Sequence, residues 1–186
     1  RMAGQDKLLQ DFAGQPLFAY ALDAVASLPV QERIVVTNTA CIRERACRLG
    51  FQAVGNPIAA KGQATSVVCG VQQVSRAAAG VWFFNADQPF LCPEVLACLL
   101  EAFWQHAGRA IIVPRVAGKP QSACIFPAAF LPELAVLEGD QGGRQVYARH
   151  LPDVVFFDFT DRQVFLDIDT IEDREKALGF LEIKKA

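Results

Sequence analysis

The sequence is poor in several features that define whole classes of protein. Its 18 lysines and arginines stand against 20 aspartates and glutamates, so the net charge of -2 lacks the basic excess that nucleic-acid binding uses. No apolar run reaches the roughly 18 residues of a membrane-spanning helix. The first residues also lack the pattern of a signal peptide. We therefore expect a cytoplasmic protein with neither a nucleic-acid nor a membrane partner.

Cysteine pairs with the short spacing of zinc or thioredoxin-like sites are missing too. The six cysteines are scattered through apolar stretches, at Cys41, Cys47, Cys69, Cys92, Cys98 and Cys124. A cysteine nucleophile needs a basic partner, and the only two histidines, His106 and His150, lie in no recognisable motif. We expect reduced, mostly buried thiols without a catalytic role.

The length of 186 residues suits one domain with a sizeable core. Apolar residues at helical spacing predict helices over residues 16–28, 40–49, 63–78, 93–106, 128–137, 143–150 and 171–181. Apolar and β-branched runs predict strands over residues 33–37, 51–54, 81–84, 110–113, 122–126, 154–159 and 165–168, with 81–84 as a central buried strand. This alternation predicts an α/β, single-domain, Rossmann-like fold with a doubly wound, mostly parallel sheet and a mixed β/α insertion.

Ligands of such a fold bind in the loops beyond the strand ends, and two of these loops carry aspartates. Asp87 follows the most apolar strand, where a carboxylate suits Mg²⁺, although it is equally suited to capping the turn before Pro89. Asp167 and Asp169 lie on one side of an extended segment, and two like charges so close need a cation. Capping of the following helix by Asp169 or Thr170 is the alternative, and both roles can coexist.

Other polar segments suit phosphates or a nucleoside. Arg1, Gly4 and Lys7 could wrap phosphates, although basic residues of this kind are more often simply solvated. Gly62 and Ser66 lie where the predicted helix 63–78 begins, and a helix N-terminus attracts anions. An N-cap formed by Ser66 or its neighbour is the alternative there.

Two glycine-bearing loops each carry one cation. The first contains Gly118, Lys119 and Gln121, and the second ends at Arg144. They could hold an acceptor molecule or merely turn the chain.

Taken together and in this order, these segments resemble the molybdenum-cofactor nucleotidyltransferases, particularly the cytidylyltransferase branch. The opening residues resemble the family's Arg-Met-Gly pattern followed by Lys, with Ala3 in place of the glycine. Further matches are the stretch ending at Ser66, the turn at Asp87, the loop ending at Arg144, and residues 167–170. The resemblance covers essentially the whole chain. It implies one NTP-transferase domain over residues 1–186, with the family's first strand and glycine-rich loop expected upstream of Arg1.

The resemblance implies Mg²⁺-dependent transfer of a nucleoside monophosphate from an NTP, CTP being favoured over GTP, to a phosphorylated acceptor of the molybdopterin type. Pyrophosphate is released. Asp87, Asp169 and Asp167 would hold the metal, and Arg1, Lys7 and Gly4 the triphosphate, so that Lys7, Arg1 and Asp87 form the catalytic set. Nucleoside contacts fall to Gly62 and Ser66, and acceptor contacts to Gly118, Lys119, Gln121 and Arg144.

Two alternatives remain open at this point. The same chemistry could act on a sugar phosphate or methylerythritol phosphate. A catalytically silent relative could instead carry the cofactor and contact a molybdoenzyme. An oxidoreductase with a dinucleotide site is disfavoured, because no glycine fingerprint with its acidic partner follows a predicted strand.

Overall fold

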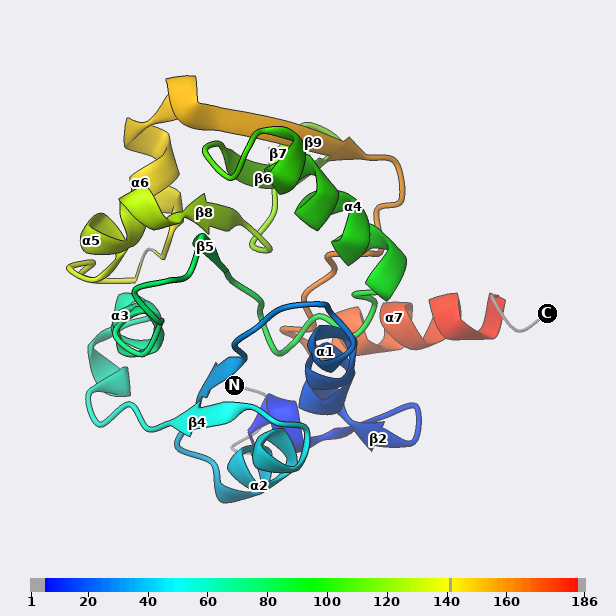
Figure 1. Ribbon diagram of the computed structural model, residues 1–186. Coiled ribbons are helices and arrows are strands. Elements are labelled where there is room, and N and C mark those ends of the chain that lie inside the picture. The colour runs from blue at the N-terminus through cyan, green and yellow to red at the C-terminus, as the bar shows by residue number, and fades with distance from the viewer. Residues whose placement is uncertain (1–5, 141, 184–186) are drawn as a thin grey trace.

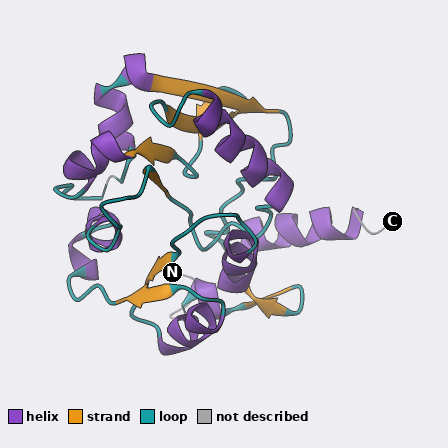
Figure 2. Cartoon of the chain, in the orientation of Figure 1, coloured by secondary structure: helices purple, strands orange, loops and turns teal. Residues whose placement is uncertain are grey.

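The computed structural model describes residues 6–140 and 142–183 of the chain (Figure 1). Helices and strands alternate along it, and Figure 2 shows the helices placed around the strands. The fold is α/β with a mixed sheet, which confirms the predicted fold class. The main sheet is not mostly parallel, however, because β6 and β9 form its one parallel pair among the described strands.

The main sheet has five strands. β6 (Ile111–Val116) runs parallel to β9 (Val154–Phe159) along its whole length. On its other side β6 is antiparallel to β8 (Ile125–Pro127), which in turn pairs with β5 (Gly80–Trp82). The last residues of β6 form a tight hairpin with β7 (Lys119–Pro120).

Two smaller pairs of strands complete the described part of the chain. β3 (Ile34–Val36) and β4 (Gln52–Val54) are parallel and are connected through a helix, as the sequence predicts. β1 (Asp11–Phe12) and β2 (Gln15–Pro16) form a short antiparallel hairpin.

Helices connect and cover these strands. The α-helices are α1 (Leu17–Ala26), α2 (Ala40–Arg48), α3 (Ala64–Val71), α4 (Pro93–Gln105), α5 (Leu131–Leu134), α6 (Arg144–Arg149) and α7 (Ile171–Ile183). Single 3₁₀ turns are η1 (Lys7–Leu9), η2 (Ala59–Lys61), η3 (Ala128–Phe130) and η4 (Leu151–Asp153). None of the helices in the two described ranges is long and apolar enough to cross a membrane.

Both faces of the main sheet are covered. On one face α1 and α4 pack against Ile112 and Ile125, and on the other α3, α5 and α6 pack against Ile111, Val113 and Phe126. Successive side chains of a strand point to opposite faces, so β6 contributes to both cores. This is the doubly wound arrangement, in which loops from both layers meet at the edges of the sheet.

The helix predicted over residues 63–78 ends early, at Val71. Beyond it, the backbone nitrogen of Ser75 donates to Glu32 Oε2 at 3.0 Å, and the Ser75 hydroxyl accepts from the nitrogen of Ala77 at 3.2 Å. Side-chain bonds of this kind compete with helical bonds for the backbone, which explains the early end.

No strand forms over residues 165–168, although the sequence predicts one. The nitrogen of Leu166 donates to the carbonyl of Gln163 at 3.0 Å and closes a local turn instead. The nitrogen of Ile168 donates to the carbonyl of Asp87 at 3.1 Å. The segment is therefore tied to a loop rather than to a strand.

Two details of the predicted strands are wrong. β5 is half-buried and, among the described strands, pairs with β8 alone, so it is no central strand there. Apolar content alone does not reveal which strands lie beside it. β6 runs through Pro114 rather than ending before it, and the Pro114 carbonyl accepts from the nitrogen of Gln121 at 2.8 Å, which continues the pairing of β6 toward β7.

All six cysteines are free, as expected, but they are not mostly buried. Cys41 and Cys47 lie on the solvent side of α2, and Cys98 lies on the solvent side of α4. Only Cys124 is buried, and burial raises the pKa of its thiol to about 12. A thiol that stays protonated is a poor nucleophile, in keeping with the expectation of no catalytic role.

The start of β5 has room for glycine only. A Cβ at Gly80 would overlap the carbonyl oxygen of Phe126 and come within 3.0 Å of the ring of Phe103. We expect Gly80→Ala to lower the free energy of unfolding by roughly 1–3 kcal/mol, the usual cost of overpacking. The control is Gly179→Ala in α7, where the added Cβ would meet nothing within 4 Å. This change should be neutral or raise the free energy of unfolding by up to about 1 kcal/mol. Urea denaturation measures both, and equal effects would contradict the packing described for β5.

Candidate functional site

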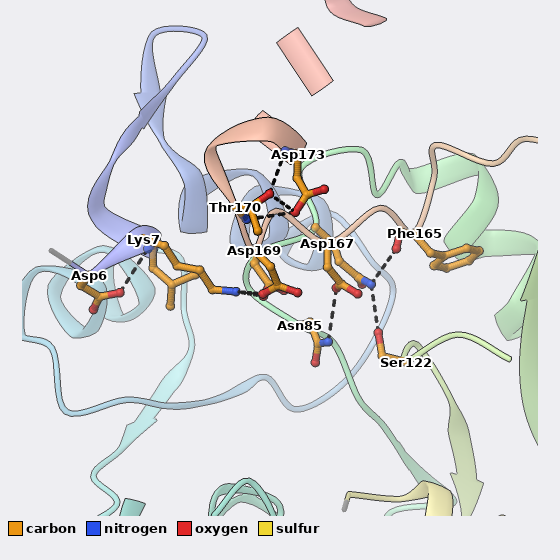
Figure 3. A network of polar contacts seen from close by, with 12 residues as sticks. Asp6, Lys7, Asn85, Ser122, Phe165, Asp167, Asp169, Thr170 and Asp173 are labelled. Atoms are coloured by element: carbon orange, nitrogen blue, oxygen red, sulfur yellow. Dashed lines mark hydrogen bonds and ion pairs between the residues drawn. The ribbon is translucent and has the colours of Figure 1, made fainter. Parts of the chain in front are cut away.

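Three segments far apart in the sequence meet at the loop after β5. η1 supplies Lys7 and the residues before α7 supply Asp169, as Figure 3 shows. The loop after β5 supplies Asp87. The backbone bond from Ile168 to Asp87 holds two of these segments together. Ile168 is 1% exposed and anchored in a core, so its neighbour Asp169 is left at the surface, as the predicted alternation required.

The ammonium group of Lys7 connects two carboxylates. Its Nζ lies 2.6 Å from Asp87 Oδ2 and 2.5 Å from Asp169 Oδ1. Burial alone would lower the pKa of Lys7, but the hydrogen bonds to both carboxylates and their charges raise it above its ordinary value. Lys7 is therefore a permanent cation at the centre of this cluster.

Asp167 lies beside the pair and is the most perturbed carboxyl group of the cluster. Burial and the negative charge of Asp87 raise its pKa from 3.8 to about 6, even though Asn85 Nδ2 donates to its Oδ1 at 3.5 Å. The side chains of Asn85 and Asp167 point toward each other in Figure 3. At neutral pH the site thus holds more negative charge than Lys7 balances.

The chemistry of the cluster suits a divalent cation. Asp87 Oδ1 is buried without a hydrogen-bond partner, and the Lys7 ammonium already occupies a cation position between Asp87 and Asp169. Within residues 6–140 and 142–183, no three His, Cys, Asp or Glu side chains come together as a metal cage. The arrangement fits the mode of Mg²⁺ binding in which one or two carboxylates are completed by water and substrate phosphates.

The end of the cluster nearest α7 has a capping role. Thr170 Oγ1 accepts from the nitrogen of Asp173 at 3.1 Å, while Asp173 Oδ2 accepts from the nitrogen of Thr170 at 2.9 Å. These reciprocal bonds satisfy free backbone donors of the first turn of α7. Because Thr170 and Asp173 make the capping bonds, the capping does not use Asp169, whose carboxylate contacts Lys7 instead.

Gln88 fixes the backbone of the loop that carries Asp87. It is 1% exposed, and its Nε2 donates to Ser122 Oγ at 3.0 Å and to the carbonyl of Phe165 at 3.1 Å. The bonds join the loop to the start of the β8 segment and to the segment before Asp167 (Figure 3). A buried amide with two partners makes the position of the loop specific.

Gly62 and Ser66 lie in a separate network at the start of α3. The buried Asn56 donates from Nδ2 to Thr65 Oγ1 at 2.9 Å and to Ser66 Oγ at 3.0 Å. Gly62 has φ +119°, and a Cβ there would lie 2.5 Å from the carbonyl oxygen of Gly139. Neither Ser66 nor Thr65 caps α3, so the N-cap alternative is wrong. Both site residues are held by local packing.

A groove of about 480 Å³ lies beside the aspartates. Lys119 and Gln121 line it together with Asp167 and Asp169, which brings half of the expected acceptor residues next to the expected metal residues. The other lining residues are Val116, Ala117, Arg162, Phe165, Leu166 and Asp173.

The remaining candidates are not gathered in this groove. Gly118 forms the turn between β6 and β7 with φ +76°. A Cβ at this position would have no atom within 4 Å. Arg144 is exposed at the start of α6 and does not line the groove. Arg1 and Gly4 lie outside the described residues.

Sequence comparison identifies the family. The model of the MobA-like NTP transferase domain matches residues 1–154. The chain belongs to the MobA-like NTP transferase family. No curated protein sequence matches it.

Solved structures agree with this family assignment at the level of the fold. Rv0371c from Mycobacterium tuberculosis is 24% identical with a TM-score of 0.79, and the match covers 95% of this chain and 90% of that one. A second structure of Rv0371c, in complex with manganese, is matched at 22% identity and a TM-score of 0.76, over 96% and 95% of the two chains.

Two further neighbours have other described roles. CMP:2-keto-3-deoxy-manno-octonic acid synthetase complexed with CTP is 13% identical with a TM-score of 0.74, over 99% of this chain and 96% of that one. Molybdopterin-guanine dinucleotide biosynthesis protein A from Archaeoglobus fulgidus is 18% identical with a TM-score of 0.70, over 97% and 92%. The family and the fold are therefore those of NTP transferases.

Two residues at this site, Gln88 and Arg162, are not among the candidates that the sequence indicates. Gln88 could have been found, because a polar residue between Asp87 and Pro89 directly after an apolar strand needs buried partners. Arg162 gave no signal, since a lone arginine in a polar segment looks like any solvated residue.

The perturbed carboxyl group gives a pH-dependent effect on stability. Because the pKa of Asp167 is raised, the folded metal-free protein binds this proton more tightly than the unfolded chain does. Ionisation of Asp167 therefore lowers stability as pH rises from about 4 to about 6, and the loss persists at higher pH. We expect Asp167→Asn to stabilise the metal-free protein at pH 8 and to have little effect at pH 4.

Chemical denaturation at the two pH values measures this difference. The control is Glu44→Gln, which removes an exposed carboxyl group of α2 outside the cluster. An Asp167→Asn effect of the same size at both pH values would contradict the raised pKa.

Proposed function

We propose that this domain is a Mg²⁺-dependent nucleotidyltransferase that moves a nucleoside monophosphate from an NTP, CTP in preference to GTP, to a phosphorylated acceptor of the molybdopterin type. The observation that carries the proposal is the pair Asp87 and Asp169, which share one cation next to the groove. Membership of the MobA-like NTP transferase family supports the reaction type.

Asp87 and Asp169 would hold the metal, with Asp167 as a further ligand or as a neighbour that orients it. The unpaired Asp87 oxygen and the excess negative charge at the site support this assignment. The manganese complex of Rv0371c shows that a protein of this fold binds a divalent ion. When bound, the metal supplies charge neutralisation for the phosphates.

Lys7 has a second role in this proposal. Once a metal binds to Asp87 and Asp169, the Lys7 ammonium no longer has to balance them. It can then pair with the triphosphate, together with Arg1 and the backbone near Gly4. A flexible lysine suits such a move, because its charge is a point at the end of four rotatable carbons.

The transfer itself needs no general base. An oxygen of the acceptor phosphate bonds to the α-phosphorus of the NTP, and the bond from that phosphorus to the bridging oxygen breaks. The electron pair leaves with pyrophosphate. The attacking phosphate is already ionised near pH 7, since its second pKa is about 6. The residues of the site therefore act by positioning and by neutralising charge.

The preference for CTP rests on weaker support. Asp167 and Asp169 match the cytidylyltransferase pattern in the position where guanylyltransferases more often carry asparagine. A synthetase of the same fold is known in complex with CTP. Gly62 and Ser66 would face the nucleoside, and Lys119 and Gln121 the acceptor, with the turn at Gly118 and the loop ending at Arg144 beside it.

The direct test is pyrophosphate release by the full-length protein from CTP, GTP, ATP and UTP, with Mg²⁺ and with molybdopterin as acceptor. We expect release with CTP above the other three. Asp87→Ala should lower it by roughly 100-fold or more, the scale seen when a group that stabilises the transition-state charge is removed. The matched control, Glu44→Ala on the surface of α2, should retain the wild-type rate. Absence of release with every NTP, or full activity of Asp87→Ala, would contradict the proposal.

A further inference from the structure

The groove beside the aspartates has an uneven distribution of unpaired charge. Asp167, Asp169 and Asp173 on its walls already have partners, which are Asn85, Lys7 and Thr170. In the part of the chain that the structure describes, no hydrogen bond or ion pair involves the side-chain nitrogens of Lys119 or Arg162. An anion in the groove could therefore bind these two cations without displacing another partner.

The two cations come from different segments. Lys119 begins β7 in the hairpin with β6, and Arg162 lies between β9 and the segment that carries Asp167. The turn before Lys119 contains Ala117 with φ +49°, a left-handed conformation that a non-glycine residue rarely adopts. The tight hairpin brings Lys119 to the groove, and the segment after β9 brings Arg162 to it.

The rest of the lining is mixed. Leu166 is half-buried, Val116 and Phe165 are buried core residues with little exposed surface, and Gln121 adds one amide. The volume of about 480 Å³ falls within the range of small-molecule sites. A guanidinium and an ammonium at one site match a phosphate, because the planar fork of arginine can bind two phosphate oxygens at once.

We propose that Arg162, together with Lys119, binds the phosphate group of the acceptor. The inference rests on the proposed function, in which the metal and the NTP phosphates would lie at Asp167 and Asp169. The phosphate of the acceptor would then be held beside them. Arg162 thereby joins Lys119 and Gln121 on the acceptor side, whereas Arg144, which the resemblance also implies for that side, does not line the groove.

The test uses 1-naphthyl phosphate as a probe, titrated into the full-length protein without nucleotide and followed by NMR chemical shifts. We expect binding at about millimolar concentration, as for a ligand with few contacts. Arg162→Gln should weaken it by about tenfold, Lys119→Gln by a similar factor, and Arg162→Lys by less than Arg162→Gln. The neutral 1-naphthol should bind much more weakly than its phosphate. Arg76→Gln, a distant exposed site, is the matched control and should leave the affinity unchanged.

The outcomes separate this inference from the proposed function. Equal affinity of wild type and Arg162→Gln, equal binding of the phosphate and 1-naphthol, or no binding of the probe would overturn the inference. Probe binding that depends on Arg162, in a protein that releases no pyrophosphate from any NTP, would support the phosphate site and refute the transferase. In an active enzyme, Arg162→Gln should raise the KM for the acceptor more than the KM for the NTP.

Discussion

One ammonium group balances two carboxylates that come from separate parts of the chain. Lys7 lies 80 residues before Asp87 and 162 residues before Asp169 in the sequence, yet its Nζ lies within hydrogen-bonding distance of both. Like charges at this spacing repel unless a cation lies between them. The surrounding structure holds the two carboxylates beside Lys7. The buried Gln88 fixes the loop that carries Asp87, and Ile168 anchors the segment that carries Asp169 in a core.

The sheet explains why these loops can meet. β6 is buried on both faces, and helices on each side set the positions of the segments that leave the strands. The loop after β5 and the segment after β9 therefore approach the same edge, where the groove also lies. In this arrangement the negative cluster and the two cations Lys119 and Arg162 lie beside one small groove, which is where the proposed function places the NTP and its acceptor.

Much of the fold could be predicted from local patterns. The strand over residues 154–159 has the predicted limits, and α2 begins at the predicted Ala40 and ends one residue early, at Arg48, because apolar spacing and stop signals are local. The early end of α3 and the absence of a strand over 165–168 depend on partners such as Glu32 and Asp87, which no local pattern reveals. The same holds for the exposed cysteines, whose burial depends on which helix face meets the core.

At the site, sequence similarity pointed to Asp87, Asp169 and Lys7, and the structure places them together. Their ion pairs could not be predicted, because spacing along the chain gives no distance between segments. The most direct test of the central claim is a crystal structure with Mn²⁺ and a non-hydrolysable CTP analogue, using the anomalous signal of manganese. The proposed site predicts a manganese peak bound by Asp87 and Asp169, with Lys7 moved to the phosphates. Manganese elsewhere, or Lys7 still between the two aspartates with nucleotide bound, would contradict it.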